Sequence, residues 1–116
     1  RGKIDEAEAQ LTKAGLNLEQ LRNAVDLEVR QAYFNYVAAR AQVETARAAV
    51  AFSGENLRLS RLRYQNGAGT SLELADALLS DTQAHTDLVG ALAAVRTTYA
   101  AFQRAVGENA GDQAGV

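Results

Sequence analysis

A single break divides an otherwise continuous helical pattern in this sequence. Apolar residues recur in steps of three and four on both sides of it, and proline, which kinks or ends helices, is absent from all 116 residues. The break contains Gly67 and Gly69. Glycine readily adopts the positive-φ conformations that end a helix and turn the chain. The sequence therefore predicts an all-α fold, in which two long helices form an antiparallel, coiled-coil-like hairpin.

Charged and hydroxyl residues beside the break support this interpretation. Arg58, Arg61 and Arg63 occupy the last turns of the first helix, where the helix dipole favours cations. From their position we expect these arginines to be solvated rather than bound to a partner. Beyond the break, Thr70 is suited to cap the second helix, and Glu73 is spaced to complete a capping box. The break is thus a stop, a short turn and a restart.

Further signals set the expected boundaries. Asp76 is acidic and close to the start of the second helix, where the dipole favours negative charge. The first helix is expected at about residues 4–66 and the second at about 71–106. Gly107 is a natural helix terminator, so we expect the hairpin to occupy residues 1–107 and the polar, glycine-rich residues 108–116 to form a disordered tail.

Two apolar lines run along the first helix. The main heptad seam alternates small with larger side chains: Ala32, Tyr36, Ala39, Val43, Ala46, Val50, Ser53, Leu57, Ser60 and Tyr64. At about 100° per residue, a second line falls roughly opposite the first: Phe34, Val37, Ala41, Ala48, Ala51, Phe52, Leu59 and Leu62. A two-helix coiled coil needs only one seam. Two opposed seams indicate a helix with a neighbour on each side, as in a wall or barrel of helices.

The second helix has a similar pattern. Its main seam is expected at Leu74, Leu78, Asp81, His85, Leu88, Leu92, Val95, Tyr99, Phe102 and Val106, and a second line is rich in alanine: Ala77, Ala84, Ala91, Ala94, Ala101 and Ala105. Folding back from the turn places Val106 near Tyr33. Residues 1–30 then overhang with an apolar stripe that is expected to be covered, either by further polypeptide or by another copy of the chain. Oligomerisation is therefore expected to complete the fold.

The sequence gives little support for a catalytic or cofactor site. Asp81 and the single histidine, His85, are one helical turn apart, which would suit a proton relay or a metal ligand pair. Without cysteine this is a poor ligand set for a transition metal, so we favour a half-solvated polar patch in the seam. No nucleophile–base arrangement or phosphate-binding loop is present, and Gly67-x-Gly69 follows a helix rather than a strand. We expect no enzyme activity, no metal and no cofactor.

Composition excludes other classes of protein. The net charge of −2 and the lack of a basic face with interleaved aromatics give no reason to expect nucleic-acid binding. No apolar run approaches the roughly 20 residues of a membrane-spanning helix, and no signal peptide is visible. The aromatic residues Tyr33, Phe34 and Tyr36 are expected to pack in the core. Because the chain begins close to a helical pattern, we expect it to be a piece of a longer protein.

The residues of the break resemble the hairpin tip of the TolC-like outer membrane efflux factors. The similarity rests on Arg63, Tyr64, Gly67, Thr70, Ser71, Leu72, Glu73, Leu74, Asp76 and Ala77. The flanking runs DLEVRQAYFNYVAARAQVETARAAV and ENLRLSRLRY are similar to the family's ascending helix, and YAAFQRAVG is similar to the end of its descending helix. The opening RGKIDEAEAQL resembles the start of the long helix that follows the last barrel strand of the second repeat. The likeness covers about residues 1–107.

The resemblance implies a function that the residues alone do not. Family members have two such repeats, assemble as trimers with an outer membrane β-barrel and a periplasmic helical tunnel, and work with a periplasmic adaptor (membrane fusion) protein and an inner membrane pump. This chain would be a periplasmic piece of the second repeat. Gly67, Ala68, Gly69, Thr70 and Ser71 would face the adaptor. Arg63 and Asp76 flank them and would fix the loop or meet the adaptor.

Three functions therefore remain open. The first is a passive tunnel segment in a tripartite efflux or type I secretion system. The second is a free-standing coiled-coil module that self-associates, and under either of these two readings the isolated chain is expected to form a dimer or another homo-oligomer. The third is an amphipathic lipid binder, which the two opposed seams argue against, because interfacial helices have one broad apolar face with a basic border.

Overall fold

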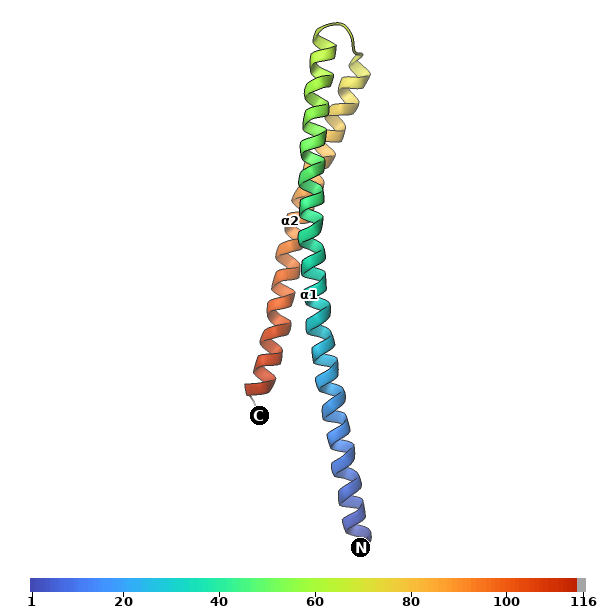
Figure 1. The fold of residues 1–116 in the computed structure, drawn as a ribbon, viewed down its shortest axis with the longest axis vertical. Helices are drawn as coiled ribbons and strands as arrows, with labels where there is room; N and C mark the ends of the chain where they lie inside the picture. Colours follow the sequence, from blue (N-terminus) through green and yellow to red (C-terminus); the bar gives the residue numbers. More distant parts are fainter. Residues whose placement is uncertain (115–116) are drawn as a thin grey trace.

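Two long antiparallel helices make up the fold (Figure 1). The computed structural model describes residues 1–114. Helix α1 comprises Gly2–Gln65 and helix α2 comprises Ser71–Ala114. At about 1.5 Å per residue, the 64 residues of α1 span about 96 Å, which accounts for the overall extents of 97 × 23 × 14 Å. The predicted all-α hairpin is confirmed, with helix starts and the turn close to the expected positions.

The seam of α1 that was predicted from the heptad pattern faces α2. Its small residues at the heptad d positions and its larger residues at the a positions are buried or half-buried: Ala32, Tyr36, Ala39, Val43, Ala46, Val50, Ser53, Leu57 and Ser60. Tyr64, beside the turn, is more exposed. Because the d residues are so small, α2 can approach the backbone of α1 closely.

The seam of α2 differs from the prediction by a small rotation of the helix. The side chains that face α1 are Leu74, Ala77, Asp81, Ala84, Leu88, Ala91, Val95, Thr98, Phe102 and Ala105. The other residues that were placed in the main seam are more than a third exposed: Leu78, His85, Leu92, Tyr99 and Val106. Four residues of the predicted alanine line, Ala77, Ala84, Ala91 and Ala105, therefore belong to the seam, whereas Ala94 and Ala101 are exposed. The prediction assigned the larger leucines to the seam. In the structure the two helices lie close together, and the smaller alanines fit between them.

The register of the hairpin sets large residues against small ones. Ser53 of α1 is hydrogen-bonded to Asp81 of α2. One heptad farther from the turn, this register sets Ala46 against Leu88, and four residues nearer the turn it sets Leu57 against Ala77. Val43, Ala46 and Ala91 form a buried cluster in the middle of the seam, with Leu88 and Val95 packed against it. Each alanine thus provides the space that a larger side chain of the other helix fills.

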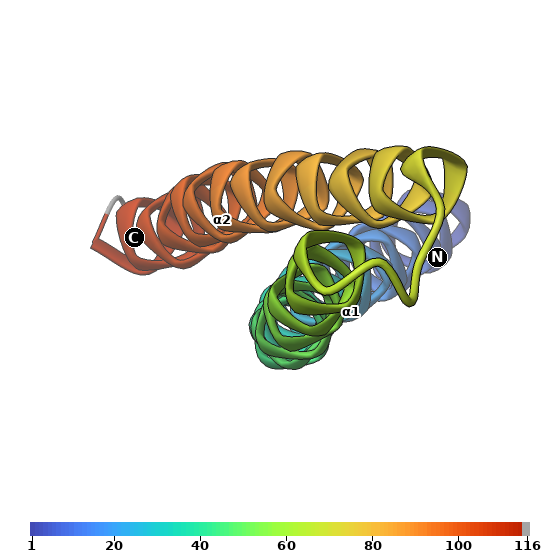
Figure 2. The ribbon, with the colours of Figure 1, turned by 90° about the horizontal axis from the view of Figure 1, so that it is seen from above.

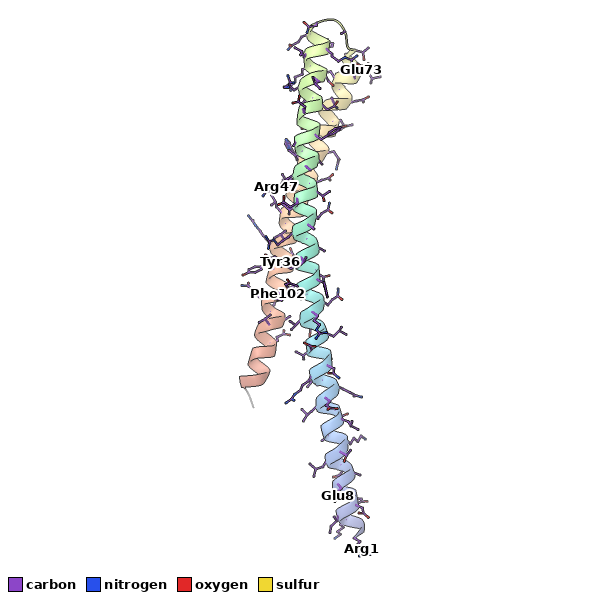
Figure 3. All side chains as sticks on the ribbon, viewed as in Figure 1. Arg1, Glu8, Tyr36, Arg47, Glu73 and Phe102 are labelled. Atoms are coloured by element: carbon purple, nitrogen blue, oxygen red, sulfur yellow. The ribbon has the colours of Figure 1, made fainter. Side chains whose placement is uncertain are left out.

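Aromatic residues close the seam near its open end. The Tyr36 ring lies 5.4 Å from the Tyr99 ring and is stacked on Phe102 at 6.4 Å, and Tyr36 and Phe102 lie between the helices in Figure 3. Tyr33 also contacts Phe102, at 5.7 Å. Core packing was expected for Tyr33 and Phe34 as well, and this is wrong for both: Tyr33 is 50% exposed in spite of its contact with Phe102, and Phe34 lies on the outer side of α1 and is 65% exposed.

Helix α2 continues beyond its predicted end. It runs through Gly107 to Ala114, so residues 108–114 are helical where a disordered tail was predicted; residues 115 and 116 lie outside the described part of the chain. Among residues 1–114, only Gly67 has a positive φ. Gly107 therefore keeps ordinary helical geometry, because a glycine permits a helix to end but does not compel it to do so.

The first third of α1 has no partner in this chain. Every residue from 1 to 24 is exposed, and the two helices diverge toward their free ends (Figures 1 and 2). The seam begins only at Val25 and Val29. We call residues 1–24 the free segment and residues 25–108 the paired region. The outer faces of the paired region also expose apolar side chains, among them Phe52 on α1 and Leu79 and Val89 on α2.

Candidate functional site

The turn between the helices, residues 66–70, is the tip of the hairpin. Helix α1 ends in a Schellman motif, in which Gly67 N–H donates to the Tyr64 carbonyl at 3.1 Å and Ala68 N–H donates to the Arg63 carbonyl at 2.8 Å. Gly67 has φ of 75°, in the left-handed region that this motif requires. The carbonyls at the end of α1 are thus satisfied by the turn itself.

Gly69 is needed at the tip for a different reason. A Cβ atom at this position would lie 3.2 Å from Cβ of Arg63, 3.2 Å from Oε2 of Glu73 and 3.4 Å from the Tyr64 nitrogen. Gly69 N–H also donates to the Arg63 carbonyl at 3.1 Å. A side chain at this position would therefore crowd the end of α1 and would require Arg63 or Glu73 to shift by a few tenths of an ångström.

The Arg63 side chain contacts the loop from the end of α1. Its Nη2 atom donates to the Ala68 carbonyl at 3.3 Å and lies 3.7 Å from Oε2 of Glu73. The Arg63 side chain thus contacts the loop in this structure. Figure 3 places Glu73 at the start of α2, directly beside the turn. Arg63 therefore ties the last turn of α1 to the loop and to the first turn of α2.

Thr70 caps α2 as predicted. Its Oγ1 accepts a hydrogen bond from Glu73 N–H at 3.1 Å, and its carbonyl accepts one from Leu74 N–H at 3.2 Å. The reciprocal half of the capping box is not formed, because the Glu73 carboxylate is directed to Arg63 instead. Arg63 and Glu73 carry opposite charges at the two helix ends, and this could have predicted their ion pair. The capping-box pattern instead assigned Glu73 to the cap of α2.

The tip presents a small, polar and mostly backbone surface. Gly67, Ala68, Thr70 and Ser71 are exposed, and Gly69 is half-buried. Asp76 lines a shallow groove beside Arg63 and Glu73, but it forms no ion pair within residues 1–114. Leu72 is 70% exposed next to the tip and was not among the predicted site residues. The structure thus brings the predicted residues together at one end, with Arg63 acting as their support.

The other candidate residues remain solvated. Arg58 forms a 2.7 Å ion pair with Glu55, and this hydrogen-bonded contact lowers the pKa of the Glu55 carboxyl below its ordinary value. His85 Nε2 lies 3.7 Å from Oδ2 of Asp81 on a largely exposed side chain, which agrees with a half-solvated patch. Among the described residues, no three His, Cys, Asp or Glu side chains are grouped to hold a metal ion.

A match to a known family explains this arrangement. The family model of the outer membrane efflux proteins matches residues 1–108. The chain belongs to the outer membrane efflux protein family. The match includes both arms of the hairpin and the whole tip, and it confirms the resemblance to the TolC-like efflux factors. No curated protein and no solved structure matches the chain.

Membership of the outer membrane efflux protein family carries several general properties. Its members are outer membrane channel proteins that take part in efflux, and they are not enzymes. They generally work with adaptor proteins and inner membrane pumps. Neither helix of this family member, over residues 1–114, is long and apolar enough to cross a membrane. Membership of the family therefore identifies the chain as part of an outer membrane efflux channel component.

Proposed function

We propose that this hairpin is a periplasmic tunnel segment of an outer membrane efflux channel and that its tip docks a periplasmic adaptor protein. The observation that carries the proposal is the construction of the tip. A loop of small residues is hydrogen-bonded to Arg63 at one end of a rod 97 Å long, with its exposed surface facing away from the helices. Such a surface favours close contact with another backbone, as two loop tips meeting end to end would make.

The outer faces of the hairpin support a place in a wall of helices. Phe34 and Phe52 of α1 and Leu72, Leu79 and Val89 of α2 are each at least 65% exposed, and they lie away from the seam. Monomeric soluble proteins rarely leave such long apolar stripes uncovered. In the proposed channel, neighbouring helices cover them, and the full-length protein assembles as a homotrimer with an inner membrane pump as a further partner.

Substitutions at Gly67 test the tip in the full channel. In a Gly67→Val variant the positive φ costs roughly 1–2 kcal/mol, because valine disfavours the left-handed region. The loop is therefore expected to change conformation. Export should be lost, and the helicity should be retained. Gly67→Asn is the matched variant, because asparagine tolerates the left-handed region, and it is expected to keep export. Gly90→Ala, in α2 with open space around the new methyl group, is the control.

These outcomes separate the conformation of the tip from its role. Export that survives Gly67→Val, with the protein present at its normal level in the outer membrane, would refute docking through the tip. Loss of export in both Gly67 variants would indicate that any side chain at the surface blocks docking. Co-purification of the adaptor with each variant then shows which step is lost.

A free-standing, self-associating module is the second candidate function, and the exposed free segment favours it. An antibody against residues 1–114 distinguishes the two candidates in fractionated source cells. A band much larger than this chain in the outer membrane fraction supports the tunnel segment. A soluble band of the size of this chain supports the module instead.

A further inference from the structure

One layer of the seam between α1 and α2 is polar. Ser53 occupies a d position of α1 and Asp81 the facing a position of α2, and the Ser53 hydroxyl donates to Oδ1 of Asp81 at 3.0 Å. Ser53 is 7% exposed, and the Asp81 side chain is 18% exposed. The other a positions of the seam carry large apolar side chains: Val29, Tyr36, Val43, Val50 and Leu57 on α1, and Leu74, Leu88, Val95 and Phe102 on α2. We call Ser53 and Asp81 the polar layer.

Within the part of the chain that the structure describes, the Asp81 carboxylate has polar contacts with two side chains. Ser53 is its hydrogen-bond donor from α1, and His85 approaches Oδ2 from one turn along α2 at 3.7 Å. The His85 side chain is 56% exposed, so its contact is screened by solvent. The Ser53 hydroxyl also lies 3.1 Å from the Val50 carbonyl, but its single proton is held more strongly by a charged acceptor. Ser53 is therefore the specific partner of Asp81 across the seam.

The remaining layers of the seam resemble one another. Each sets a small residue of one helix against a larger residue of the other, so a shift by one heptad would again set large against small. One such shift would place Asp81 against Ala46 and Ser53 against Leu74. The carboxylate would then lose its cross-helix donor while remaining partly buried, which is unfavourable. Steric fit alone does not oppose this shift, whereas the polar layer does.

We propose that the polar layer fixes the register of the helix pair, with Asp81 as the positioning residue, and that the seam is less stable than a wholly apolar one as a result. A single polar residue at an a position is a known device for setting register in coiled coils. The opposite shift would bring Asp81 to Ser60, which also carries a hydroxyl. Within one chain the turn opposes both shifts, because either one would separate Arg63 from Glu73 and from the loop.

The polar layer has this role whether or not the tip docks another protein. Ser53 is the fourth seam position of α1 counted from the turn, after Tyr64, Ser60 and Leu57. If the tip rearranges, the layer still holds α1 and α2 in one alignment. The closed turn constrains the register of two helices of one chain, and the polar layer also constrains helices that pair between two copies.

The test replaces both residues of the polar layer with an alanine–leucine pair, like the pair that Ala46 and Leu88 form elsewhere in the seam. The double variant Ser53→Ala with Asp81→Leu recreates the Ala46–Leu88 layer. Because an apolar pair of similar volume removes the desolvation of the carboxylate, the melting temperature is expected to rise by about 5 °C. Ser53→Ala alone leaves the carboxylate without its donor and is expected to lower the melting temperature by about 5–10 °C.

Engineered cysteines report the register, since the chain has no cysteine of its own. Gln42 and Ala94 are exposed flanking positions three heptads from the Arg63–Glu73 contact, so a Gln42→Cys, Ala94→Cys pair reports the observed register. A Gln42→Cys, Asp87→Cys pair reports the shift that sets Asp81 against Ala46. Cross-links within one chain and between two chains are separated by mass.

The parent chain is expected to cross-link only through the first cysteine pair, and the double variant through both pairs. Asp81→Asn, which keeps a hydrogen-bonding side chain, and His85→Gln are expected to behave as the parent does. A double variant that cross-links only through the first pair would overturn the proposal. So would a parent chain in which the second pair forms equally well.

Discussion

The free segment and the paired region share one sequence pattern and have opposite environments. In the free segment, Ile4, Leu11 and Leu18 alternate with Ala7 and Ala14 at the same heptad spacing as the large and small residues of the seam. Yet all of these side chains are exposed, whereas their counterparts from Val29 to Leu57 are buried or half-buried against α2. The heptad pattern therefore specifies a face that is suited to burial, and the presence of a second helix decides whether the face is buried.

The same truncation at an a position of each region is expected to separate them most clearly. Leu57 is 8% exposed and Leu18 is 60% exposed. Leu57→Ala should lower the free energy of unfolding by about 2–3 kcal/mol, because it removes buried methyl groups and leaves a cavity. Leu18→Ala should change it by less than about 0.5 kcal/mol. Urea denaturation followed by circular dichroism measures both. Equal losses would show that another copy covers the free segment in solution.

Enlarging a d position should give the next largest difference. Ala46 lies in the buried cluster with Val43 and Ala91, so Ala46→Leu should force the helices apart and lower the free energy of unfolding by about 1–3 kcal/mol. Ala14→Leu in the free segment is the matched variant. It should have almost no effect, since alanine and leucine are both good helix formers. A stabilised Ala46→Leu variant would contradict the close packing of the seam.

Amide hydrogen exchange should resolve the boundary between the regions without any substitution. Amides of the free segment are expected to exchange through local fraying, with opening free energies near zero, because no tertiary contact protects them. Amides around Val43 and Ala46 should exchange only on global unfolding. Protection that extends to Leu11 would place a further helix against the free segment.

The smallest effect is expected where the two regions are alike, on the solvated outer faces. Arg58 lowers the pKa of the Glu55 carboxyl in the folded chain. The ion pair therefore contributes stability at pH values above the unfolded pKa of Glu55, and this contribution is lost as pH falls through the lower, folded pKa. Arg58→Gln should raise the Glu55 pKa toward its ordinary value in an NMR titration. The change in stability should be slight, because both side chains are more than half exposed.

The parts of the structure that depend on local sequence were predictable. Gly67, Thr70 and the uninterrupted periodicity of α1 identify the turn, the cap and the long helix, because each acts through neighbouring residues in the chain. The family resemblance carried by the tip residues led to the same family as the match over residues 1–108.

The parts that depend on the approach of two helices were not predictable in the same way. The choice between Ala77 and Leu78, or between Ala91 and Leu92, as the residue facing α1 is decided by how near the helices lie, and neither helix specifies that distance alone. The Arg63–Glu73 contact also joins residues from the two arms. The end of α2 was missed at Gly107, since a glycine is compatible with both a helix interior and a helix end.

The unbroken length of α1 has a mechanical consequence. Helices bend sharply at proline, at Gly/Ser pairs or at π-bulges; α1 has no proline, and it runs as a single α-helix from Gly2 to Gln65 through its one adjacent Ser–Gly pair, Ser53 and Gly54. It therefore behaves as a lever pivoting on its contact with α2, with the free segment as one arm and the stretch leading to Arg63 as the other. A force on the loop that tilts α1 would therefore move its N-terminal end in the opposite direction, and the fold would stay the same.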